Sequence, residues 1–426
     1  MIKKLIKPSL SFKSFILALG LNISKPQSKH IIRIGESLIV SEGTKTLSAL
    51  YRQWVDAPDV SAAADFLSQS PWQSKEIDDN LKIFIICYLL AKVKGKPVIT
   101  VSLDDSTTRK NKDTNKLEVV DWVFDHAGAG KGQTLYCKGA VHLNLRVQIG
   151  KYGFNFSWRF YLKKVTVRTL NRYRTKENRI KFKTKNNIAC EMLKELKSFL
   201  PNHFTVYVLF DRWYSSAKLI KFIHEKLGRH IICAIKSNRK LNGTKMTEWA
   251  KKLRHRQYIR VTCTAADGTN KTYLVRKVQG RFSRIPFDVC VLLSKRHKRA
   301  KSSQYFLCTD LNLRPQEILN LYNKRWSIEV DYWYLKQYLG LGDFRVQSYE
   351  AACKWYSIVH LVLTFLQWKL YEALKGSTNV KSVADIIRLH REEHAWQLVK
   401  SICEETLRTY SVDKGMEPYI LKAACF

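Results

Sequence analysis

Three acidic sites in the sequence carry side chains that could act together in metal-dependent chemistry. Asp104 and Asp105 end a β-branched hydrophobic run, Asp211 ends another, and Glu329 lies in the segment LYNKRWSIEVDYWYLKQYLGL. An acid at the end of a buried strand can project into a shared cleft, and carboxylates held close together repel one another unless cations lie between them. Two Mg²⁺ ions about 4 Å apart would suit such a set, because they stabilise the attacking and leaving oxygens of phosphoryl transfer. A single strand-terminal aspartate more often caps a turn, so the hypothesis depends on the combination.

Glu329 shares one face of a predicted helix with Tyr322, Arg325 and Lys336. At roughly 100° per residue the four side chains fall within an arc of about 60°. A core-facing stripe would be apolar, whereas this mixture suits a surface that meets both a metal ion and DNA phosphates. The alternative is an exposed helix stabilised weakly by an Arg–Glu pair four residues apart. The spacing alone leaves both interpretations open.

The pattern Y-x2-R-x3-E-x6-K resembles the signature of a group of bacterial insertion-sequence transposases, and all four positions match. The segments TVSLDDSTTRK and LFDRWYSSAKLI are similar to that group's surroundings of the first and second catalytic aspartates. CTDLNLRPQEILNLYNKRWSIE is similar to the approach to the glutamate helix, and FLSQSPWQSKEI to a helical N-terminal part. The similarity spans most of the chain, so we identify the sequence as a member of these DDE transposases.

The resemblance implies an RNase H-like core in which Asp104, Asp211 and Glu329 are catalytic and hold two Mg²⁺ ions, for which Mn²⁺ can substitute. The first aspartate of the family is followed two positions on by Thr or Ser. Asp104 fits through Ser106, and Asp105 fits through Thr107. We prefer Asp104 and keep Asp105 as a further metal ligand, so the choice between them stays open.

Six residues are expected to contact DNA. They are Tyr322, Arg325, Lys336, Trp326, Arg212 and Lys236. Trp326 and Trp213 each adjoin an arginine and could stack on a displaced base near the cut, although such tryptophans are more often core anchors.

The elements that must position these residues indicate an α/β protein with an RNase H-like catalytic core. We divide it into five parts, which are 1–95 (helical, binding transposon ends), 96–240 (first part of the core), 241–310 (β-rich insertion), 311–370 (last part of the core, with the glutamate helix) and 371–426 (helical, a candidate for dimerisation). Within them, Asp79 or Asn80 is predicted to cap a helix that continues to about Val93. Ser215 or Ser216 is predicted to cap a helix that ends at Gly228, and Asp267-Gly268 to form a hairpin turn.

The charge balance points to nucleic acid. Lys and Arg number 74 against 36 Asp and Glu, which gives a net charge of +38. Such a chain repels itself unless a polyanion neutralises it, and phosphate contacts by Lys and Arg supply most of the non-specific affinity for DNA. The basic runs 163–185 and 294–303 could follow a DNA backbone, with Tyr173 or Phe182 stacking on bases. The alternative is a solvated loop in a basic protein.

Other motifs are weaker. The Gly-rich segment DHAGAGKGQT is not a P-loop, because Asp125 stands where the first Gly is needed and Gly follows Lys131. We interpret it as a mobile loop near the active site. Ten scattered cysteines form no CxxC pair, and the histidines show no ligand spacing that we associate with zinc. The N-terminal apolar run is broken by Lys13 and is not expected to be a secretion signal, and the longest apolar stretches are too short to span a membrane.

We therefore expect a cytoplasmic, nucleoid-associated bacterial transposase that assembles as a homodimer on DNA. It would cut DNA strands at transposon ends and join them to target DNA. Two alternatives remain, namely a non-catalytic DNA-binding descendant that keeps the fold, and a related metal-dependent nuclease without strand transfer.

Overall fold

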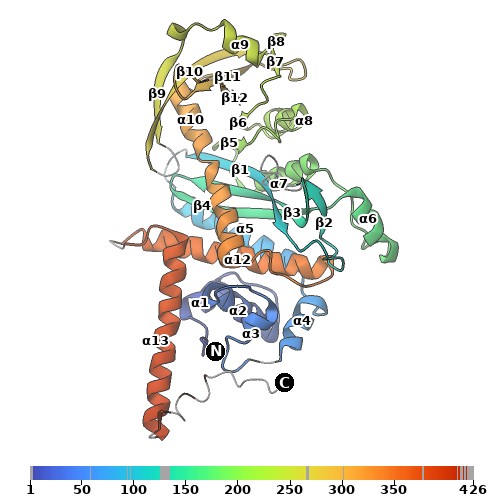
Figure 1. The fold of residues 1–426 in the computed structure, drawn as a ribbon, viewed down its shortest axis with the longest axis vertical. Helices are drawn as coiled ribbons and strands as arrows, with labels where there is room; N and C mark the ends of the chain where they lie inside the picture. The colour runs from blue at the N-terminus through green and yellow to red at the C-terminus, as the bar shows by residue number, and fades with distance from the viewer. Residues whose placement is uncertain are drawn as a thin grey trace.

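A computed structural model describes residues 3–57, 59–93, 95, 97–124, 135–264, 268–300, 302–376, 379–409, 411, 412, 416 and 419. It is an elongated mixed α/β structure in which one large sheet lies between helices, with the N-terminal helices at one end (Figure 1).

The chain begins with five helices, each of which starts where the sequence offers apolar residues at helical spacing. They are α1 (Leu10–Ala18), α2 (Lys25–Val40), α3 (Leu47–Tyr51), α4 (Val60–Ser68) and α5 (Ser74–Ala91). Side chains cap the first four, as at α2, where Ser24 and Gln27 form a capping box. The N-terminal apolar run is helix α1, whose Phe12, Phe15 and Ile16 are buried in the core.

The start predicted for α5 was wrong. The helix begins at Ser74, and Asp79 and Asn80 lie inside it. Neither residue is needed as a cap, because the Asp79 carboxylate binds Lys75 and Lys82 and the Asn80 amide donates to the Glu76 carbonyl one turn earlier. Partners within the helix thus replace the capping role that the sequence suggested.

A ten-stranded sheet contains most of the strands. Its members are β1 (Val98–Arg109), β2 (Asp121–Phe124), β3 (Tyr136–Ile149), β4 (Tyr152–Tyr161), β5 (Thr205–Phe210), β6 (His230–Ala234), β9 (Ile259–Thr264), β10 (Asn270–Gly280), β11 (Val289–Lys295) and β12 (Gln304–Cys308). The order is β2-β3-β1-β5-β6-β12-β11-β10-β9, with β4 also paired to β3. The pairs β1–β5 and β5–β6 are parallel, and the other pairs are antiparallel. The runs 139–150 and 154–167 predict antiparallel neighbours, and the strand–helix–strand run 203–238 predicts a parallel pair. The antiparallel β3–β4 pair and the parallel β5–β6 pair confirm both predictions.

The region 241–310 continues this sheet. After the small hairpin of β7 (Lys240–Leu241) and β8 (Thr244–Lys245) come α9 (Met246–Lys252) and strands β9 to β12, and β12 pairs with β6. The expected β9–β10 hairpin is confirmed by the pair Thr264↔Asn270, while Asp267 lies outside the described residues. The same holds for the predicted mobile loop at 125–134.

The remaining helices flank the sheet and complete the chain. They are α6 (Lys164–Leu170), the 3-10 turn η1 (Asn171–Tyr173), α7 (Lys185–Phe199), α8 (Ala217–Lys221), the π-helical turn η2 (Phe222–Lys226), the 3-10 turn η3 (His255–Gln257), α10 (Pro315–Asn323), α11 (Trp326–Trp333), the π-helical turn η4 (Tyr334–Tyr338), α12 (Tyr349–Ala373) and α13 (Val383–Thr409). The predicted cap of α8 is confirmed at Ser216, whose hydroxyl accepts from the Leu219 amide, and Gly228 follows with a φ of 65°.

Helix α12 is the central element of the packing. Most of its side chains are buried, and it lies across the molecule between the sheet and the N-terminal helices (Figure 1). Residues of α2, α5, the sheet and α12 belong to one continuous hydrophobic core. A smaller cluster, which includes Leu209, Ile232, Phe306 and Ile318, lies under α10. Among the described residues no helix is both long and apolar enough to cross a membrane.

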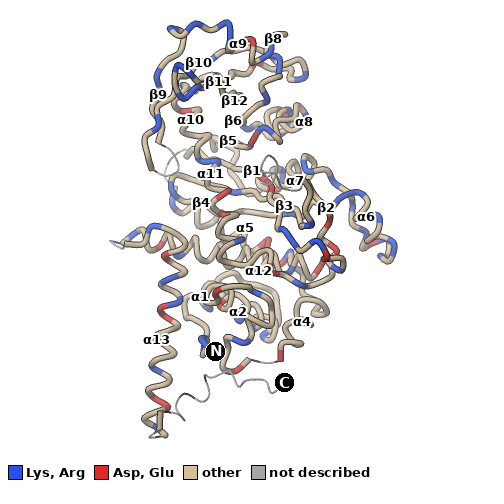
Figure 2. Tube along the Cα trace, viewed as in Figure 1, with Lys and Arg blue, Asp and Glu red and all other residues tan. Residues whose placement is uncertain are grey.

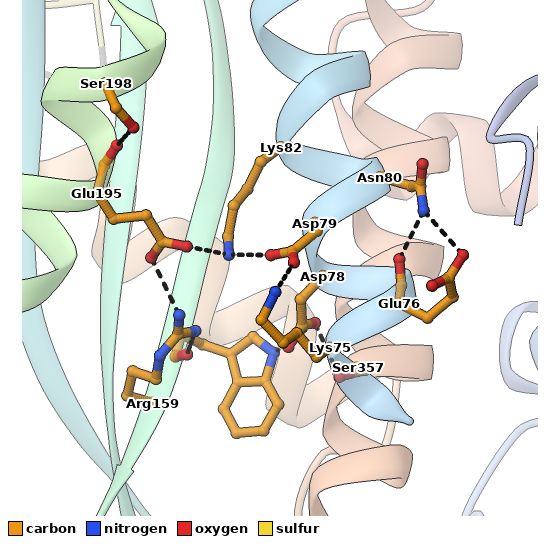
Figure 3. A network of polar contacts seen from close by, with 11 residues as sticks. Lys75, Glu76, Asp78, Asp79, Asn80, Lys82, Arg159, Glu195, Ser198 and Ser357 are labelled. Carbon is orange, nitrogen blue, oxygen red and sulfur yellow. Dashed lines mark hydrogen bonds and ion pairs between the residues drawn. The ribbon is translucent and has the colours of Figure 1, made fainter. Parts of the chain in front are cut away.

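A polar network fastens α5 to the sheet (Figure 3). The buried Lys82 ammonium contacts Asp79 at 3.0 Å and Glu195 of α7 at 2.5 Å. The second oxygen of Glu195 accepts from Arg159 of β4 at 3.0 Å. Because Lys82 is almost fully buried, its charge needs both carboxylates. The network therefore ties the N-terminal helices to the strands that precede the candidate site.

Asp78, next to this network, provides a pH-dependent test of the packing. Burial raises its pKa to about 6, although Arg159 and a hydrogen bond from Ser357 oppose the shift. The folded protein then holds the Asp78 proton more tightly than the unfolded chain, so stability falls as pH rises from about 4 through 6. Asp78→Asn lacks the titrating group. We therefore expect the free energy of unfolding of this variant to fall by about 1–2 kcal/mol less than that of the wild type over this pH range.

Asp79→Asn is the matched control, since hydrogen bonds from Lys75 and Lys82 lower the pKa of Asp79 despite the opposing effect of burial. That variant should lose stability relative to the wild type as pH rises. Parallel pH profiles for the two variants would contradict the assignment of the Asp78 environment.

Candidate active site

The register between β1 and β5 brings Asp104 and Asp211 together. The last pair of this parallel ladder is Leu103↔Phe210; Asp104 is the next residue of β1, and Asp211 is the residue directly after the end of β5. Side chains alternate between the faces of a sheet, so two residues that follow a register pair project from the same face. The electrostatic influence of Asp211 on Asp104 agrees with their closeness. The predicted placement of two aspartates side by side is thus what the register produces.

The sequence predicts that strand β1 ends at the aspartates, but the strand continues beyond them. It continues to Arg109, and Asp104 and Asp105 pair with Asn144 and Leu143 of β3. The parallel neighbour β5 ends at Phe210, whereas the antiparallel neighbour β3 continues. From Asp104 onward, the edge of β1 that faced β5 has no paired strand. The Asp104 carboxylate can therefore reach the cleft although β1 itself continues.

Arg325 connects Asp104 to Glu329. One guanidinium nitrogen lies 3.1 Å from Oδ2 of Asp104, and the other donates to Oε1 of Glu329. Arg325 is the residue that precedes α11, and Glu329 is one turn into that helix. In the same helix the Tyr332 hydroxyl donates to the Asp104 carbonyl at 2.8 Å. Helix α11 is thereby held against β1 at the position of the aspartate.

Asp105 faces the other side of the sheet. Its Oδ1 accepts from the Tyr214 hydroxyl at 2.6 Å, and its Oδ2 is 2.6 Å from the Lys185 ammonium of α7. Both carboxylate oxygens are thus bound to protein groups on the α7 side. The structure separates the two adjacent aspartates, with Asp104 directed to the glutamate helix and Asp105 to a buried tyrosine.

A cavity of about 1340 Å³ opens beside the aspartates. Its wall combines acidic, basic and aromatic side chains, namely Asp104, Asp105, Asp211, Arg212, Trp213, Lys236, Tyr305, Phe306, Tyr322 and Arg325. Arg212 and Lys236 are exposed at the surface. In Figure 2 acidic segments lie near β1 and β5, and basic residues follow α6 and the strands at the far end of the sheet. An acidic floor with a basic rim suits a polyanion whose reacting group meets metal ions.

The donor set around Asp104 fits a divalent cation with oxygen ligands. Burial raises the pKa of Asp104 to about 7; Arg325 opposes this shift, and the negative charges of Asp105 and Asp211 add to it. A cation between Asp104 and Asp211 would relieve that repulsion. Beside Asp104, the buried amide of Asn144 has no hydrogen-bond partner among the described residues. It is therefore available to an ion's bound water, which Mg²⁺ characteristically retains.

The four residues of the predicted stripe do not lie on one straight helix. Helix α10 ends at Asn323, and hydrogen bonds from residue i to i−3 tighten the chain at Lys324 and Arg325 before α11 begins. A π-helical turn, η4, then contains Lys336. The predicted arc was wrong in this respect, because tertiary contacts with β1 and β12 shape the segment.

Tyr322 and Lys336 consequently have different surroundings. Tyr322 lines the cavity and packs on Phe306, with 4.7 Å between ring centroids, and burial raises its pKa to about 12. Lys336 of η4 contacts a later part of β1. Its ammonium donates to the Ser106 hydroxyl at 2.6 Å and to the Thr107 carbonyl at 2.9 Å. Of the four stripe residues, Tyr322 and Arg325 line the cavity, and Tyr322 does so against Phe306 of β12.

Trp326 is placed apart from the aspartates. It lines a second cavity of about 630 Å³ behind α11, together with Arg146, Lys324, Asp331 and Lys381. Trp213, by contrast, lines the acidic cavity and is 54% exposed. Trp213 therefore lies in the cavity with the aspartates, whereas Trp326 lies on the opposite side of α11.

The basic run 163–185 forms α6, η1 and the approach to α7, at one side of the molecule (Figure 1). Tyr173 is 93% exposed, and Phe182 is 39% exposed. The run 294–303 starts at the end of β11 and leads to β12, and its last two residues, Ser302 and Ser303, line the acidic cavity. Both runs are accessible to a large partner.

Three residues at the site were not singled out from the sequence. They are Lys185, Tyr214 and Tyr332. Tyr214 could have been found, since it follows Asp211 by three residues in the quoted segment LFDRWYSS. Tyr332 follows Glu329 at the same spacing. Lys185 was hidden within a basic run whose individual contacts depend on the packing of α7.

Comparison with known families supports the geometry. The family described as "DDE superfamily endonuclease" matches residues 34–270, more than half of the chain. The family described as "Archaeal putative transposase ISC1217" matches residues 160–383. The chain belongs to the DDE transposase superfamily. This confirms the DDE transposase resemblance drawn from the sequence.

One solved structure shares the overall fold of this DDE-family chain. It is described as the cryo-EM structure of the piggyBac transposase synaptic complex with hairpin DNA. The TM-score is 0.50 at 13% sequence identity, over 99% of this chain and 87% of the other. No curated protein sequence gives a significant match. At this identity the likeness concerns the fold.

The Asp105–Tyr214 contact can be tested by a double-mutant cycle. Tyr214→Phe removes a buried hydroxyl and leaves one Asp105 oxygen without that donor, which should lower the free energy of unfolding by about 1–3 kcal/mol. Asp105→Asn should lose less in the Tyr214→Phe background than in the wild type, because the partner is already absent. Chemical denaturation of the four proteins measures the coupling. Strictly additive effects would mean that the contact contributes nothing.

Proposed function

We propose that this DDE-family chain is a transposase that cleaves DNA strands at transposon ends and transfers the new 3′ ends into target DNA. The observation that carries the proposal is the meeting of Asp104 and Asp211 at the end of the β1–β5 ladder, with Arg325 connecting Asp104 to Glu329. Cut-and-paste transposition accounts for this carboxylate set, for the basic rim of the cavity and for a net charge of +38.

An RNase H-like core is the second element of the proposal. In support, β4, β3 and β1 are antiparallel neighbours, β1, β5 and β6 are parallel neighbours, and a later helix brings the glutamate to β1. The strands from β9 to β12 would be the insertion between the second aspartate and the glutamate. The helical region 1–95 would bind transposon ends, and the region after residue 371 would contribute to a homodimer formed on DNA.

Asp104, Asp211 and Glu329 would hold two Mg²⁺ ions, or Mn²⁺ in their place. When bound, the ions would activate water and stabilise the charge that develops on the phosphate. We assign the first carboxylate to Asp104 rather than Asp105. In support, Arg325 contacts both Asp104 and Glu329, while both oxygens of Asp105 are already bound by Tyr214 and Lys185.

The cationic residues would position the DNA. Arg325 would exchange a carboxylate for a phosphate oxygen when the ions neutralise Asp104 and Glu329, because a guanidinium binds either anion bidentately. Arg212 and Lys236 would bind the DNA backbone at the cavity rim. The Tyr322 hydroxyl would donate a hydrogen bond to a phosphate oxygen. Lys336 would orient the far part of β1 through Ser106 and Thr107.

The central test is cleavage of DNA that carries the element's ends, with Mg²⁺. We expect Asp104→Asn, Asp211→Asn and Glu329→Gln each to lower the cleavage rate by about a hundred-fold or more, since loss of even an outer-shell partner costs 10–100-fold at a metal site. Asp105→Asn is the matched neighbour and should lose far less. A larger loss in Asp105→Asn than in Asp104→Asn would reverse the assignment of the first carboxylate.

The same assay separates the related activities. A wild type that binds end DNA but never nicks it in Mg²⁺ or Mn²⁺ would instead be a DNA-binding descendant without catalysis. Cleavage without joining to a target duplex would identify a nuclease. Retained activity in Glu329→Gln would exclude the proposed carboxylate set.

The cavity rim gives a prediction about salt dependence. Arg212→Ala and Lys236→Ala should weaken DNA binding similarly for every sequence, and each should reduce the slope of log affinity against log salt by about 1. Lys194→Ala, at an exposed position of α7 outside the cavity, is the control. Fluorescence anisotropy across a salt series measures the slopes. A slope unchanged in the rim variants would remove the rim from the DNA path.

A further inference from the structure

A second group of potential metal ligands lies far from the aspartates, where α13 crosses α2. Glu36 of α2 and His390 and His394 of α13 each direct one ligand atom to a common point, and these atoms all lie within 4.8 Å of one another. All three side chains are buried. Among the described residues, this is the one group of three or more His, Cys, Asp or Glu side chains that meets this distance; the two-ion site proposed for Asp104, Asp211 and Glu329 does not require it. The sequence interpretation missed it, because it did not use the spacing of His390 and His394, one helical turn apart.

The charge of Glu36 needs a compensating cation. Glu36 is fully buried, and its Oε2 lies within hydrogen-bonding distance of the Nε2 atoms of His390 and His394. Within the described part of the chain, the ion pairs of Glu36 involve only these two histidines. A buried carboxylate must be neutralised by a positive partner. That partner is either an imidazolium or a metal ion held by two neutral imidazoles.

The local geometry is close to that of a metal site. Oε2 of Glu36 lies 2.5 Å from Nε2 of His390 and 3.0 Å from Nε2 of His394. Ligand atoms of a tetrahedral zinc ion lie about 3.3 Å apart, as follows from metal–ligand distances of about 2.0–2.1 Å. Small outward movements of the three side chains would therefore admit an ion. Two histidines four residues apart on a helix with a carboxylate are a common zinc ligand set.

The other oxygen of Glu36 is held in place by the start of α1. Oε1 accepts from the Ser9 amide at 2.7 Å and from the Ser9 hydroxyl at 2.8 Å. Such outer contacts fix a ligating carboxylate and are characteristic of built metal sites. Arg391, between the two histidines, binds the Ile39 and Ser41 carbonyls at the end of α2. The group therefore joins α1, α2 and α13.

We propose that Glu36, His390 and His394 form a structural zinc site that fastens α13 to the N-terminal helices. The complete burial of the ligands favours a structural role over a catalytic one, since substrate has no access. Three protein ligands with water in the fourth position are typical of catalytic zinc sites, but burial of these ligands excludes a substrate here. This site is independent of the Mg²⁺ chemistry proposed for Asp104, Asp211 and Glu329, because the residues and the elements differ.

The test begins with metal analysis of the full-length protein, purified without added zinc and dialysed with a mild chelator. We expect about one zinc per chain, retained in Asp211→Asn and lost in the double variant His390→Ala/His394→Ala. His360→Ala, which removes another buried histidine on α12, should keep the zinc. Zinc retained in the double variant at the wild-type level would place the metal elsewhere and overturn the proposal.

A second measurement covers the case in which the double variant does not fold. The wild type is stripped with a strong chelator and refilled with Zn²⁺ or Co²⁺. Zinc should restore the melting temperature by at least a few degrees, because an ion that binds only the folded state stabilises it. Cobalt should give the visible absorption of a tetrahedral site with nitrogen and oxygen ligands and no thiolate band. An unchanged melting temperature and the absence of that absorption would show a metal-free hydrogen-bonded cluster instead.

Discussion

The repulsion between carboxylates that the sheet forces together is the constraint on which the site depends. Asp104 and Asp211 follow the register pair Leu103↔Phe210, so neither can withdraw without breaking the most buried ladder of the sheet. A slip of one residue would turn one aspartate to the opposite face. Burial is the main cause of the raised pKa of Asp104, and the negative charges of Asp105 and Asp211 add to it. Arg325 offsets part of the repulsion in the protein alone, at the position where substrate and cations are expected to act.

Much of the site could be predicted from short stretches of sequence. The hydrophobic runs before Asp104 and Asp211 indicate adjacent strands, and the spacing around Glu329 agrees with a helix that meets them. These features are local, and the family matches agree with the superfamily that they suggested. The continuation of β1 past Asp105 could not be predicted, because it depends on β3, whose pairing is long-range. The separate directions of Asp104 and Asp105 follow from the same pairing.

The missed features share a physical cause. The turn at Lys324 and Arg325 and the π-helical turn at Lys336 arise from contacts with β1, which override the helical preference of the sequence. Glu36 and His390 are separated by 354 residues and meet only because α2 and α13 both pack against α12. Helical spacing identifies a pair of histidines on one helix, but not the acid that faces them. Tertiary packing therefore decides which local patterns become sites.

The continuity of the sheet has a consequence for how such a chain can diversify. Strands β11, β10 and β9 extend outward from β12, so that each is supported by the strand before it and none contacts β1 or β5 within the ladder order. The outermost strand, β9, alternates buried and exposed residues and has one free edge. Changes at the outer edge of β9 would leave the register of β1 and β5 unchanged, although β9 also contacts α10, whose Gln316 and Asn323 donate to the Thr262 and Thr264 carbonyls. The architecture thus separates the outer strands, whose sequence can vary among relatives, from β1 and β5, whose register must stay the same for the site to form.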